Sequence, residues 1–549
     1  MNETASFLSY VPVSLAFGTS GLRGLVEDLT DLEAYINVKA ALRYLLAAGD
    51  IASQSTVVIA GDLRPSTERI LRACTQAILD AGCRVENAGK IPSPALICRT
   101  LSTARAGVMV TGSHIPFDRN GIKITKPAGE VLKSDEPGIL MEVERVRAEE
   151  YRRTARQSPF DASGMLERPP VLPPIDDSAE EAYVRRYLTS FGPAGLRGLR
   201  ILVFQHSAVG RDILPRILRE LGADVVTAGR TETFVALDTE NITDEQLGHI
   251  EDLAAEAAAN GAPVHAVVTT DGDSDRPLVV AVLSTAEAGP SGRRVRFLPG
   301  DLLGIITAEY VSADAAVVPI SANDAVERRM RERGVVLETT KIGSPYVISA
   351  MDDLRRAGKY TRIVGWEANG GFLSGSDLAL EGGTLAALPT RDSTLPILAT
   401  LFAAAREGIE LSALWSRLPA RFGRSGLLDS VPSAISRALL ARWVPAGGTL
   451  DVQFRGADAE GAVWLELRRT LARVFTPALG FDDIVRINVL DGVRVYFRNG
   501  DIAHVRPSGN APQLRIYANT DTQQRADQIV ESALREPDGI LRELTRPAG

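Results

Sequence analysis

Short apolar runs that alternate with longer amphipathic segments are the feature that most limits how this chain can fold. Residues 56–60 have the pattern of a buried strand and lie between two segments with helical periodicity, 31–49 and 66–82. A second apolar run follows at 107–110. A strand, a helix and another strand at this spacing predict an α/β unit.

The same alternation recurs twice along the 549 residues, a length too great for a single core. A second unit begins with an apolar strand at 199–204, and a third begins with a helix at 299–310. The third unit is expected to close with a long helix over residues 392–408. The other elements predicted here are helices at 211–221 and 244–260 and strands at 316–320 and 335–339.

The C-terminal part has a different pattern, in which short strands predominate. A hairpin turn is predicted at 498–501, where the sequence is Arg-Asn-Gly-Asp. A Pro-rich stretch at 156–174 predicts a linker after the first unit. The C-terminal strands are expected at 449–454, 484–489, 493–498, 502–505 and 513–517, followed by a helix at 522–535. These patterns predict a small α+β domain after three α/β units.

A polar turn after the run 107–110 holds the first candidate for chemistry. Its sequence, Thr-Gly-Ser-His-Ile-Pro at 111–116, is expected to lift the hydroxyl of Ser113 out of the strand end, beside the imidazole of His114. An exposed serine can carry a transferred group covalently. Open α/β sheets place their reactive groups at the C-terminal ends of their strands, where this turn lies. Taken alone, a Ser-His pair is more often a simple turn.

Three carboxylates alternate in the loop Asp-Gly-Asp-Ser-Asp-Arg at 271–276, which follows another apolar strand. Asp271, Asp273 and Asp275 can converge on one hard cation, and Mg²⁺ prefers carboxylate and phosphate oxygens together with water. The alternatives are an acidic surface turn or a calcium loop. An EF-hand loop needs a Glu near its twelfth position, and the chain instead returns at once to a strand. The loop therefore predicts a divalent-metal site.

Two further loops carry groups suited to phosphate and to sugar. The segment Arg-Pro-Ser-Gly-Asn-Ala-Pro at 506–512 offers a guanidinium and backbone N–H groups to a dianionic phosphate. The segment Gly-Trp-Glu-Ala-Asn-Gly-Gly at 365–371 offers a carboxylate and an amide to sugar hydroxyls. Each loop alone is as easily a turn. The candidate residues are Arg506, Ser508, Gly509 and Asn510 in the first loop and Glu367 and Asn369 in the second.

Together and in this order, the four loops resemble the motifs of the α-D-phosphohexomutase superfamily, which includes phosphoglucomutases and phosphomannomutases. Phe-Gly-Thr-Ser-Gly-Leu-Arg-Gly at 17–24 is similar to the opening motif of that family. Asn-Gly-Ile-Lys at 120–123 and Thr-Lys-Ile-Gly at 340–343 are similar to two more of its segments. The resemblance spans nearly the whole chain.

The resemblance implies an α/β fold with three successive α/β domains that have mixed sheets, and a small C-terminal α+β domain, arranged around a central cleft. Each domain would carry one of the four loops. The expected domains are 1–165 with the phosphoserine loop, 166–296 with the metal loop, 297–425 with the sugar loop and 426–549 with the phosphate loop.

The resemblance also implies an interconversion of hexose 1-phosphate and hexose 6-phosphate through a phosphoserine enzyme and a bisphosphorylated sugar. Phosphorylated Ser113 would donate its phosphoryl group while Mg²⁺ is held by that group and the three aspartates. Lys123 is expected to be the general acid and base, with His114 supporting the loop. Arg23 and Arg276 would flank the transferring phosphate. The expected substrate contacts are Thr19, Ser20, Lys341, Gly343, Glu367, Asn369, Arg506, Ser508, Gly509 and Asn510.

Glucose 1,6-bisphosphate, or the cognate hexose bisphosphate, is the expected activator. Several positions depart from the family motifs. Gly112 stands where the family has Ala, Ile115 where it has Asn, and Ser344 where some members have His. The loss of Asn at 115 removes a polar anchor of the serine loop. Asn510-Ala511 stands for Thr-Glu in the phosphate loop.

The sugar loop leaves the substrate open. Its string Glu-Ala-Asn-Gly at 367–370 is similar to that of phosphoacetylglucosamine mutases, whereas the rest of the chain resembles bacterial phosphomannomutases and phosphoglucomutases. We favour mannose or glucose phosphate, with an N-acetylglucosamine or glucosamine phosphate as the alternative. A metal-dependent sugar-phosphate phosphatase and a non-catalytic phosphosugar-binding protein are the rival classes.

Composition limits the classes of partner and the cellular compartment that we expect for this chain. A net charge of −8 argues against nucleic acid, which needs a concentrated basic surface. The three cysteines, Cys74, Cys83 and Cys98, fit no zinc pattern and predict a reduced cytoplasmic setting. No apolar run approaches ~20 residues, so no membrane span is expected. The chain is expected to be a monomer or a dimer.

Overall fold

The computed structural model describes residues 7–18, 21–283, 293–443, 449–454, 461–508 and 513–546. The chain divides into two compact units. The first unit comprises Met1–Val317 and Gly343–Arg417, and the second comprises Val318–Ile342 and Leu418–Gly549.

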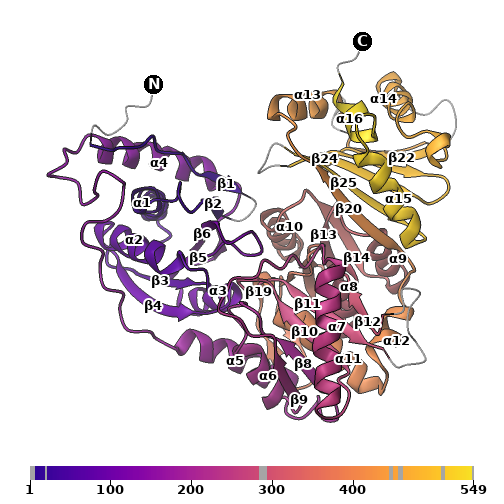
Figure 1. Ribbon diagram of the computed structural model, residues 1–549, viewed down its shortest axis with the longest axis horizontal. Helices are drawn as coiled ribbons and strands as arrows, with labels where there is room; N and C mark the ends of the chain where they lie inside the picture. Colours follow the sequence, from indigo (N-terminus) through magenta and orange to yellow (C-terminus); the bar gives the residue numbers. More distant parts are fainter. Residues whose placement is uncertain are drawn as a thin grey trace. The chain divides into compact units, whose positions relative to one another are not determined.

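A mixed sheet of seven strands forms the N-terminal part of the first unit, in the order β1-β2-β6-β5-β3-β4, with β7 beside β6 (Figure 1). Strand β3 pairs in parallel with β4 and β5, whereas β5 and β6 are antiparallel. Helices α1, α2 and α4 bury apolar side chains together with those of β3 and β5. The strands are β1 Ala16–Gly18, β2 Gly21–Leu25, β3 Thr56–Gly61, β4 Arg84–Lys90, β5 Ala106–Val110, β6 Arg119–Lys126 and β7 Gly129–Glu130. The helices are α1 Asp31–Ala48, α2 Thr67–Asp80, α3 Ser93–Thr103 and α4 Glu136–Tyr151.

Helix α1 shows why the predicted segment 31–49 is helical. The Thr30 side chain accepts a hydrogen bond from Glu33 N and caps the first turn. Gly49 ends the helix with a left-handed φ of 79°, a conformation that glycine adopts without strain. The helix and its two caps therefore confirm that prediction.

A second mixed sheet follows, with the strand order β12-β11-β10-β8-β9. Strand β10 is parallel to β8 and antiparallel to β11. The β10–β11 hairpin places the loop 271–276 at the C-terminal end of β10. The strands are β8 Arg200–Phe204, β9 Asp224–Ala228, β10 Ala266–Thr270, β11 Pro277–Val282 and β12 Val295–Leu298, and the helices are α5 Ser178–Phe191, α6 Ile213–Glu220 and α7 Asp244–Ala259.

The third part of the first unit contains the strand series β13-β15-β16-β19. Strand β13 is parallel to β15, and the later neighbours are antiparallel. Helices α8 and α11 lie side by side (Figure 1). The strands are β13 Ala315–Pro319, β15 Ile363–Trp366, β16 Phe372–Ser374 and β19 Leu388–Asp392, with the small pair β17 Leu378–Ala379 and β18 Thr384–Leu385. The helices are α8 Gly300–Tyr310, α10 Ser344–Ala357, α11 Thr394–Glu407 and α12 Leu411–Ser416.

The second unit is built on an antiparallel sheet in the order β20-β25-β24-β23-β22-β21. Its core gathers apolar side chains from this sheet and from α13 to α16. The predicted turn at 498–501 joins β23 to β24, and its Gly500 has a φ of 88°. The strands are β14 Val336–Thr340, β20 Phe422–Leu428, β21 Asp451–Gln453, β22 Ile484–Asn488, β23 Val493–Phe497, β24 Ile502–Pro507 and β25 Leu514–Thr520. The helices are α9 Asp324–Arg333, α13 Ser433–Trp443, α14 Ala462–Ala472, α15 Gln523–Leu534 and α16 Ile540–Thr545, with a 3₁₀ turn at Pro477–Leu479.

The three α/β parts with mixed sheets and the C-terminal α+β part confirm the predicted fold class. The helix expected over 392–408 is wrong at its start, because Leu388–Asp392 is strand β19 and α11 begins at Thr394. The Asp392 carboxylate accepts a hydrogen bond from Thr394 N, which begins the helix two residues later. The arrangement around a central cleft stays a prediction.

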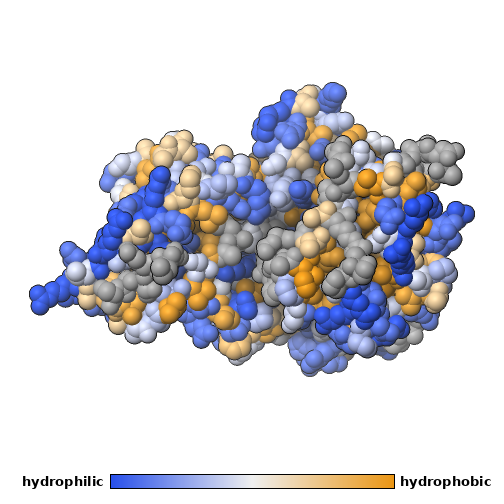
Figure 2. All heavy atoms as spheres, turned by 90° about the horizontal axis from the view of Figure 1, so that it is seen from above, coloured by the Kyte–Doolittle hydropathy of each residue, from blue (hydrophilic) through white to orange (hydrophobic). Residues whose placement is uncertain are grey.

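The surface carries mostly hydrophilic side chains with scattered hydrophobic ones on the face shown in Figure 2. Among the described residues, no helix is both long and apolar enough to cross a lipid bilayer. Cys74, Cys83 and Cys98 are free thiols.

Candidate functional site

The serine loop turns sharply after β5. Ser113 has a φ of 55°, a left-handed conformation that is rare for residues other than glycine and is often found at functional sites. Its hydroxyl donates to Asp271 Oδ2 at 2.6 Å and lies 3.3 Å from His114 Nδ1. The expected exposure of Ser113 is wrong, because its side chain is fully buried and bonded to the loop 271–276.

Arg64 holds the backbone of this loop. Its guanidinium Nη1 donates to Pro116 O at 2.6 Å and to Arg119 O at 2.8 Å, and Nη2 donates to Ser113 O at 2.9 Å and to Ile115 O at 2.5 Å. Its Nε donates to Asp62 Oδ2 at 3.2 Å. The five N–H groups of the guanidinium thus all have acceptors, three of them carbonyls of the loop and one the carbonyl of Arg119 at the start of β6.

The guanidinium also explains one departure from the family motif. A Cβ added at Gly112 would lie 2.4 Å from Arg64 Cζ, so Arg64 occupies the space that an alanine methyl would need. The guanidinium also stacks on the ring of Phe234, with Cζ 4.0 Å from the ring centroid. The loop that lost an asparagine anchor at Ile115 is therefore held through its carbonyls.

The three aspartates meet as predicted. Asp271, Asp273 and Asp275 are buried, and their ligand oxygens all lie within 4.8 Å of one another. Among the described residues, no donor forms a hydrogen bond with Asp273 Oδ1 or Asp275 Oδ1, although both atoms are buried. Buried carboxylate oxygens without donors are costly unless a cation compensates them. This donor set fits a hard divalent ion.

The carboxylates differ in their electrostatics. Burial and the charges of Asp273 and Asp275 raise the pKa of Asp271 well above its ordinary value. Burial alone would also raise the pKa of Asp275, but Arg391, Lys123 and Arg276 lower it far below its ordinary value. Asp275 is therefore the most firmly ionised of the three.

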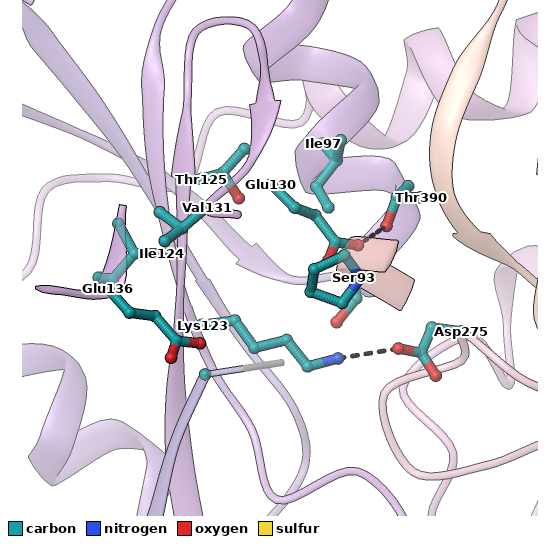
Figure 3. A pocket seen from close by; sticks show the side chains of 12 residues that line it. Ser93, Ile97, Lys123, Ile124, Thr125, Glu130, Val131, Glu136, Asp275 and Thr390 are labelled. Carbon is teal, nitrogen blue, oxygen red and sulfur yellow. Dashed lines mark hydrogen bonds and ion pairs between the residues drawn. The ribbon is translucent and has the colours of Figure 1, made fainter. Parts of the chain in front are cut away.

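Lys123 lies on β6 and bridges two of these carboxylates, and its bond to Asp275 is drawn in Figure 3. Its Nζ donates to Asp273 Oδ2 at 2.6 Å and to Asp275 Oδ2 at 2.8 Å. Burial alone would lower the pKa of Lys123, but the two carboxylates raise it above its ordinary value. Lys123 is therefore held firmly in its charged form in this arrangement, and its role as a general acid and base stays a prediction.

Two arginines add positive charge to the site, and one histidine lies beside them. Arg276 Nε lies 3.6 Å from Asp275 Oδ1. Burial and the neighbouring Arg276 and Arg391 lower the pKa of Arg23 to about 10, so it stays charged at neutral pH. Burial and the charges of Arg276 and Arg23 hold the pKa of His114 well below its ordinary value. His114 is thus a neutral imidazole suited to hydrogen bonding.

The sugar loop lies between β15 and β16. Glu367 is buried, and its Oε2 accepts from Arg391 Nη1 at 3.0 Å. Asn369 is also buried, but its Oδ1 accepts from Gly371 N at 3.0 Å within the loop itself. The role of Asn369 in reading a sugar stays a prediction.

The remaining predicted contacts are divided between the two units. Gly343 precedes α10 in the first unit with a φ of 130°, whereas Lys341 lies exposed in the second. Ser344 begins α10, and its Oγ donates to Glu130 Oε2 at 3.3 Å. A pocket lined in part by Glu130, Thr390 and Lys123 lies beside it (Figure 3).

The predicted phosphate loop belongs to the second unit. Arg506 lies at the end of β24, with its Nε 3.8 Å from Asp491 Oδ1, and Ser508 follows it. Asp491 Oδ2 also accepts from Ile342 N at 3.0 Å, so one carboxylate joins two predicted substrate segments. Four predicted contacts lie outside the described residues: Thr19, Ser20, Gly509 and Asn510.

Two site arginines were not predicted. Arg64 follows strand β3 in the string Asp-Leu-Arg, and Arg391 lies in the string Thr-Arg-Asp-Ser at 390–393. A polar string directly after an apolar strand was the available signal for Arg64, whereas Arg391 lies inside strand β19. Neither string carries a recognisable motif, because the partners of both arginines are far away in sequence.

Family profiles match the chain in four stretches. They are described as the alpha/beta/alpha domains I, II and III and the C-terminal domain of phosphoglucomutase/phosphomannomutase, and they match residues 14–150, 181–282, 299–422 and 454–536 respectively. Each stretch falls inside one predicted domain, and the predicted boundaries stay predictions.

Curated proteins and a solved structure resemble the chain over most of its length. It is 37% identical to a phosphomannomutase of Sinorhizobium fredii over 94% of this chain and 98% of that protein. It is 32% identical to a phosphoglucosamine mutase of Kineococcus radiotolerans over 61% of this chain and 70% of that protein. The crystal structure of a putative phosphomannomutase from Thermus thermophilus shares the fold, with a TM-score of 0.65 and 20% identity over 95% of this chain and 98% of that one.

Proposed function

Because this chain belongs to the phosphoglucomutase/phosphomannomutase family, we propose that it moves a phosphoryl group between positions 1 and 6 of a hexose. It is an intramolecular phosphotransferase of the isomerase class. The proposed route passes through phosphorylated Ser113 and a bisphosphorylated sugar. Hexose bisphosphate would serve as the activator that keeps the serine phosphorylated.

One observation carries this proposal. The Ser113 hydroxyl is held 2.6 Å from Asp271, at the edge of a buried set of three carboxylates and beside a lysine, two arginines and a neutral histidine. A phosphoryl group on this oxygen would meet positive charge on several sides, which is how proteins stabilise phosphoryl transfer.

The charged residues have distinct proposed roles. Lys123 would give a proton to a departing sugar oxygen and recover it when a sugar hydroxyl attacks. Arg23 and Arg276 would bind the oxygens of the transferring group by charge-assisted hydrogen bonds. His114 would orient the serine hydroxyl at 3.3 Å.

The metal proposal is that Asp271, Asp273, Asp275 and the phosphorylated Ser113 hold Mg²⁺. The two buried aspartate oxygens that lack donors among the described residues support this donor set. When bound, the ion would neutralise charge on the transferring phosphoryl group.

The proposed substrate contacts come from both units of the chain. In the first unit these are Glu367, Asn369 and Gly343, with Thr19 and Ser20. In the second unit, Arg506, Ser508, Gly509 and Asn510 would bind the phosphate that is not transferred, and Lys341 is a further proposed substrate contact. The predicted cytoplasmic location and the state of monomer or dimer belong to the same proposal.

We favour mannose or glucose phosphate as substrate, because 37% identity to a phosphomannomutase extends over 94% of the chain. An amino-sugar phosphate is the second candidate. It is favoured by the Glu-Ala-Asn-Gly string at 367–370 and by the 32% identity to a phosphoglucosamine mutase.

The test is a phosphorus NMR time course with Mg²⁺ and a trace of glucose 1,6-bisphosphate. Mannose 1-phosphate, glucose 1-phosphate, glucosamine 1-phosphate and N-acetylglucosamine 1-phosphate are supplied separately, with Ser113→Ala as the control. We expect the first two to become their 6-phosphates with the natural protein, and a loss of at least about 10³-fold in the variant.

Each result separates the candidates. Conversion of an amino sugar alone would identify the sugar loop as the source of specificity. Release of inorganic phosphate as the main product would favour a phosphatase, and ligand binding without conversion would favour a non-catalytic binding protein.

A further inference from the structure

Four consecutive residues at the end of β19, here named the junction segment (390–393), contact all three parts of the first unit. Thr390 Oγ1 donates to Glu130 Oε1 at 2.5 Å in the N-terminal part. Ser393 Oγ donates to Ser274 O at 2.8 Å in the loop that carries the three aspartates. The segment therefore fixes elements that are distant in sequence.

Arg391 is the charged member of the junction segment and is 3% exposed. Its Nε and Nη2 both donate to Asp275 Oδ2, at 3.1 and 2.9 Å. Its Nη1 donates to Glu367 Oε2 at 3.0 Å. One guanidinium thus joins a proposed metal ligand to a proposed sugar ligand.

The sugar loop is shaped around this arginine. A Cβ added at Gly371 would lie 2.6 Å from Arg391 Cδ and 2.7 Å from its Cγ. Any larger residue would push the arginine stem aside, so the second glycine of the pair 370–371 gives Arg391 its path to Asp275. This steric evidence is independent of the hydrogen bonds.

The charge of Arg391 has two opposed effects on the aspartates. It occupies Asp275 Oδ2 together with Lys123, which leaves Oδ1 without a donor among the described residues. It also places a positive charge next to the donor set that would hold a divalent cation. At this short distance, the repulsion between the charge of Arg391 and a divalent cation outweighs the benefit of holding the Asp275 carboxylate in one rotamer.

We propose that Arg391 is a positioning residue that couples the metal loop to the sugar loop, holding Glu367 for the sugar while weakening the affinity of the aspartates for a divalent cation. This inference rests on the proposed function and deepens it. Cation binding and sugar binding are linked through one buried side chain, so a change there moves the two affinities in opposite directions.

The test compares Arg391→Gln and Arg391→Lys with the natural protein. Mn²⁺ binding is measured by electron paramagnetic resonance without substrate, and KM and kcat are measured with the hexose phosphate that turns over. We expect Arg391→Gln to bind Mn²⁺ about tenfold more tightly or better, because one positive charge is removed, and to raise KM. Arg391→Lys should keep the natural Mn²⁺ affinity but raise KM, because one ammonium cannot serve both carboxylates as the fork does.

Two further variants keep the test decisive. Gly371→Ala should change Mn²⁺ affinity and KM in the same directions as Arg391→Gln, by displacing the arginine stem, and it serves if Arg391→Gln does not fold. Arg147→Gln is the matched control, since Arg147 is similarly buried but pairs with Glu33 in the N-terminal core. It should lower the melting temperature and leave Mn²⁺ affinity unchanged.

The contrary result is equally clear. Mn²⁺ affinity that is unchanged or weaker in both Arg391→Gln and Gly371→Ala would reduce Arg391 to a structural ion pair. If the natural protein isomerises no hexose phosphate, the proposed function fails, whereas the Mn²⁺ measurement still decides whether Arg391 opposes the cation.

Discussion

Arg64 shows how a single buried side chain can set the position of a proposed nucleophile. Its three bonds to carbonyls of the serine loop, with a fourth to Arg119 O in β6, replace side-chain anchors, and Asp62 supplies the compensating charge. A planar fork with five donors suits this task, whereas an ammonium offers three donors from one point. The position of Ser113 therefore depends on a residue 49 positions earlier in the chain.

We expect Arg64→Lys to lower kcat by about 10²-fold, because a shift of the serine loop of roughly 1 Å misplaces the reacting oxygen. KM should change little, since Arg64 touches no proposed substrate contact among the described residues. Steady-state kinetics with the substrate identified by NMR provide the measurement.

The control for Arg64→Lys is Arg69→Lys. Arg69 lies on α2, where it pairs with Asp31 and donates to Leu29 O at 2.9 Å, away from the serine loop. Its replacement should leave kcat unchanged. Equal losses of kcat in both variants would mean that general destabilisation, and not loop position, explains the effect.

Among the elements, strand β19 is connected to helix α5 through the buried carboxylate of Asp392. Asp392 accepts from the hydroxyl of Tyr183 at 2.6 Å and also from the hydroxyl of Tyr187. Both tyrosines lie on α5, and both are fully buried. The contact holds the end of β19 next to α5, which keeps Arg391 in place one residue earlier.

Tyr183→Phe should lower the free energy of unfolding by about 1.5–3 kcal/mol, because a buried carboxylate loses one charge-assisted hydrogen bond. Tyr10→Phe is the comparison, since the Tyr10 hydroxyl bonds the neutral Thr30 hydroxyl at 3.0 Å. We expect a smaller loss of about 0.5–1.5 kcal/mol there. Urea unfolding followed by circular dichroism measures both losses. Equal losses would contradict the view that the bond to the charged Asp392 is the stronger one.

At the scale of the whole molecule, each unit buries a neutral histidine. Burial lowers the pKa of His206 in the first unit to about 4 and that of His504 in the second unit to about 3. The unfolded chain takes up protons on these groups near pH 6.5, whereas the folded chain does not. Keeping these two histidines neutral therefore costs no stability above pH 6.5. Below that pH it lowers the free energy of unfolding, until the pH reaches about 4 for His206 and about 3 for His504.

We expect the free energy of unfolding to fall by about 1.4 kcal/mol per pH unit for each histidine below pH 6.5. His504→Gln should remove one of these contributions and flatten the profile between pH 6 and 4, as measured by urea unfolding at several pH values. His249→Gln is the control, because His249 is exposed. A profile equally steep in all three proteins would exclude His504 as a cause.

Much of the fold could be predicted because strands and helices leave local periodic signals. Residues 56–60 and 107–110 are strands as expected. Gly49 ends its helix and Gly500 lies in the turn between two strands, both as expected. The helix start at 392 was wrong because Asp392 serves its own strand and α5, which is a contact over more than 200 positions. Ser113 and the three aspartates could be found because each loop keeps a motif within a few residues.

The chemical groups that the loops carry can be read from the sequence alone: a serine with a histidine, three alternating carboxylates and a sugar loop with a glutamate. Which of these groups meet depends on how the chain folds. The Ser113 hydroxyl bonds Asp271 across 158 positions, and Arg391 bonds Asp275 across 116. Such contacts depend on the packing of three domains and not on neighbours in the chain, so the roles of Arg64 and Arg391 could not be predicted before the fold was known.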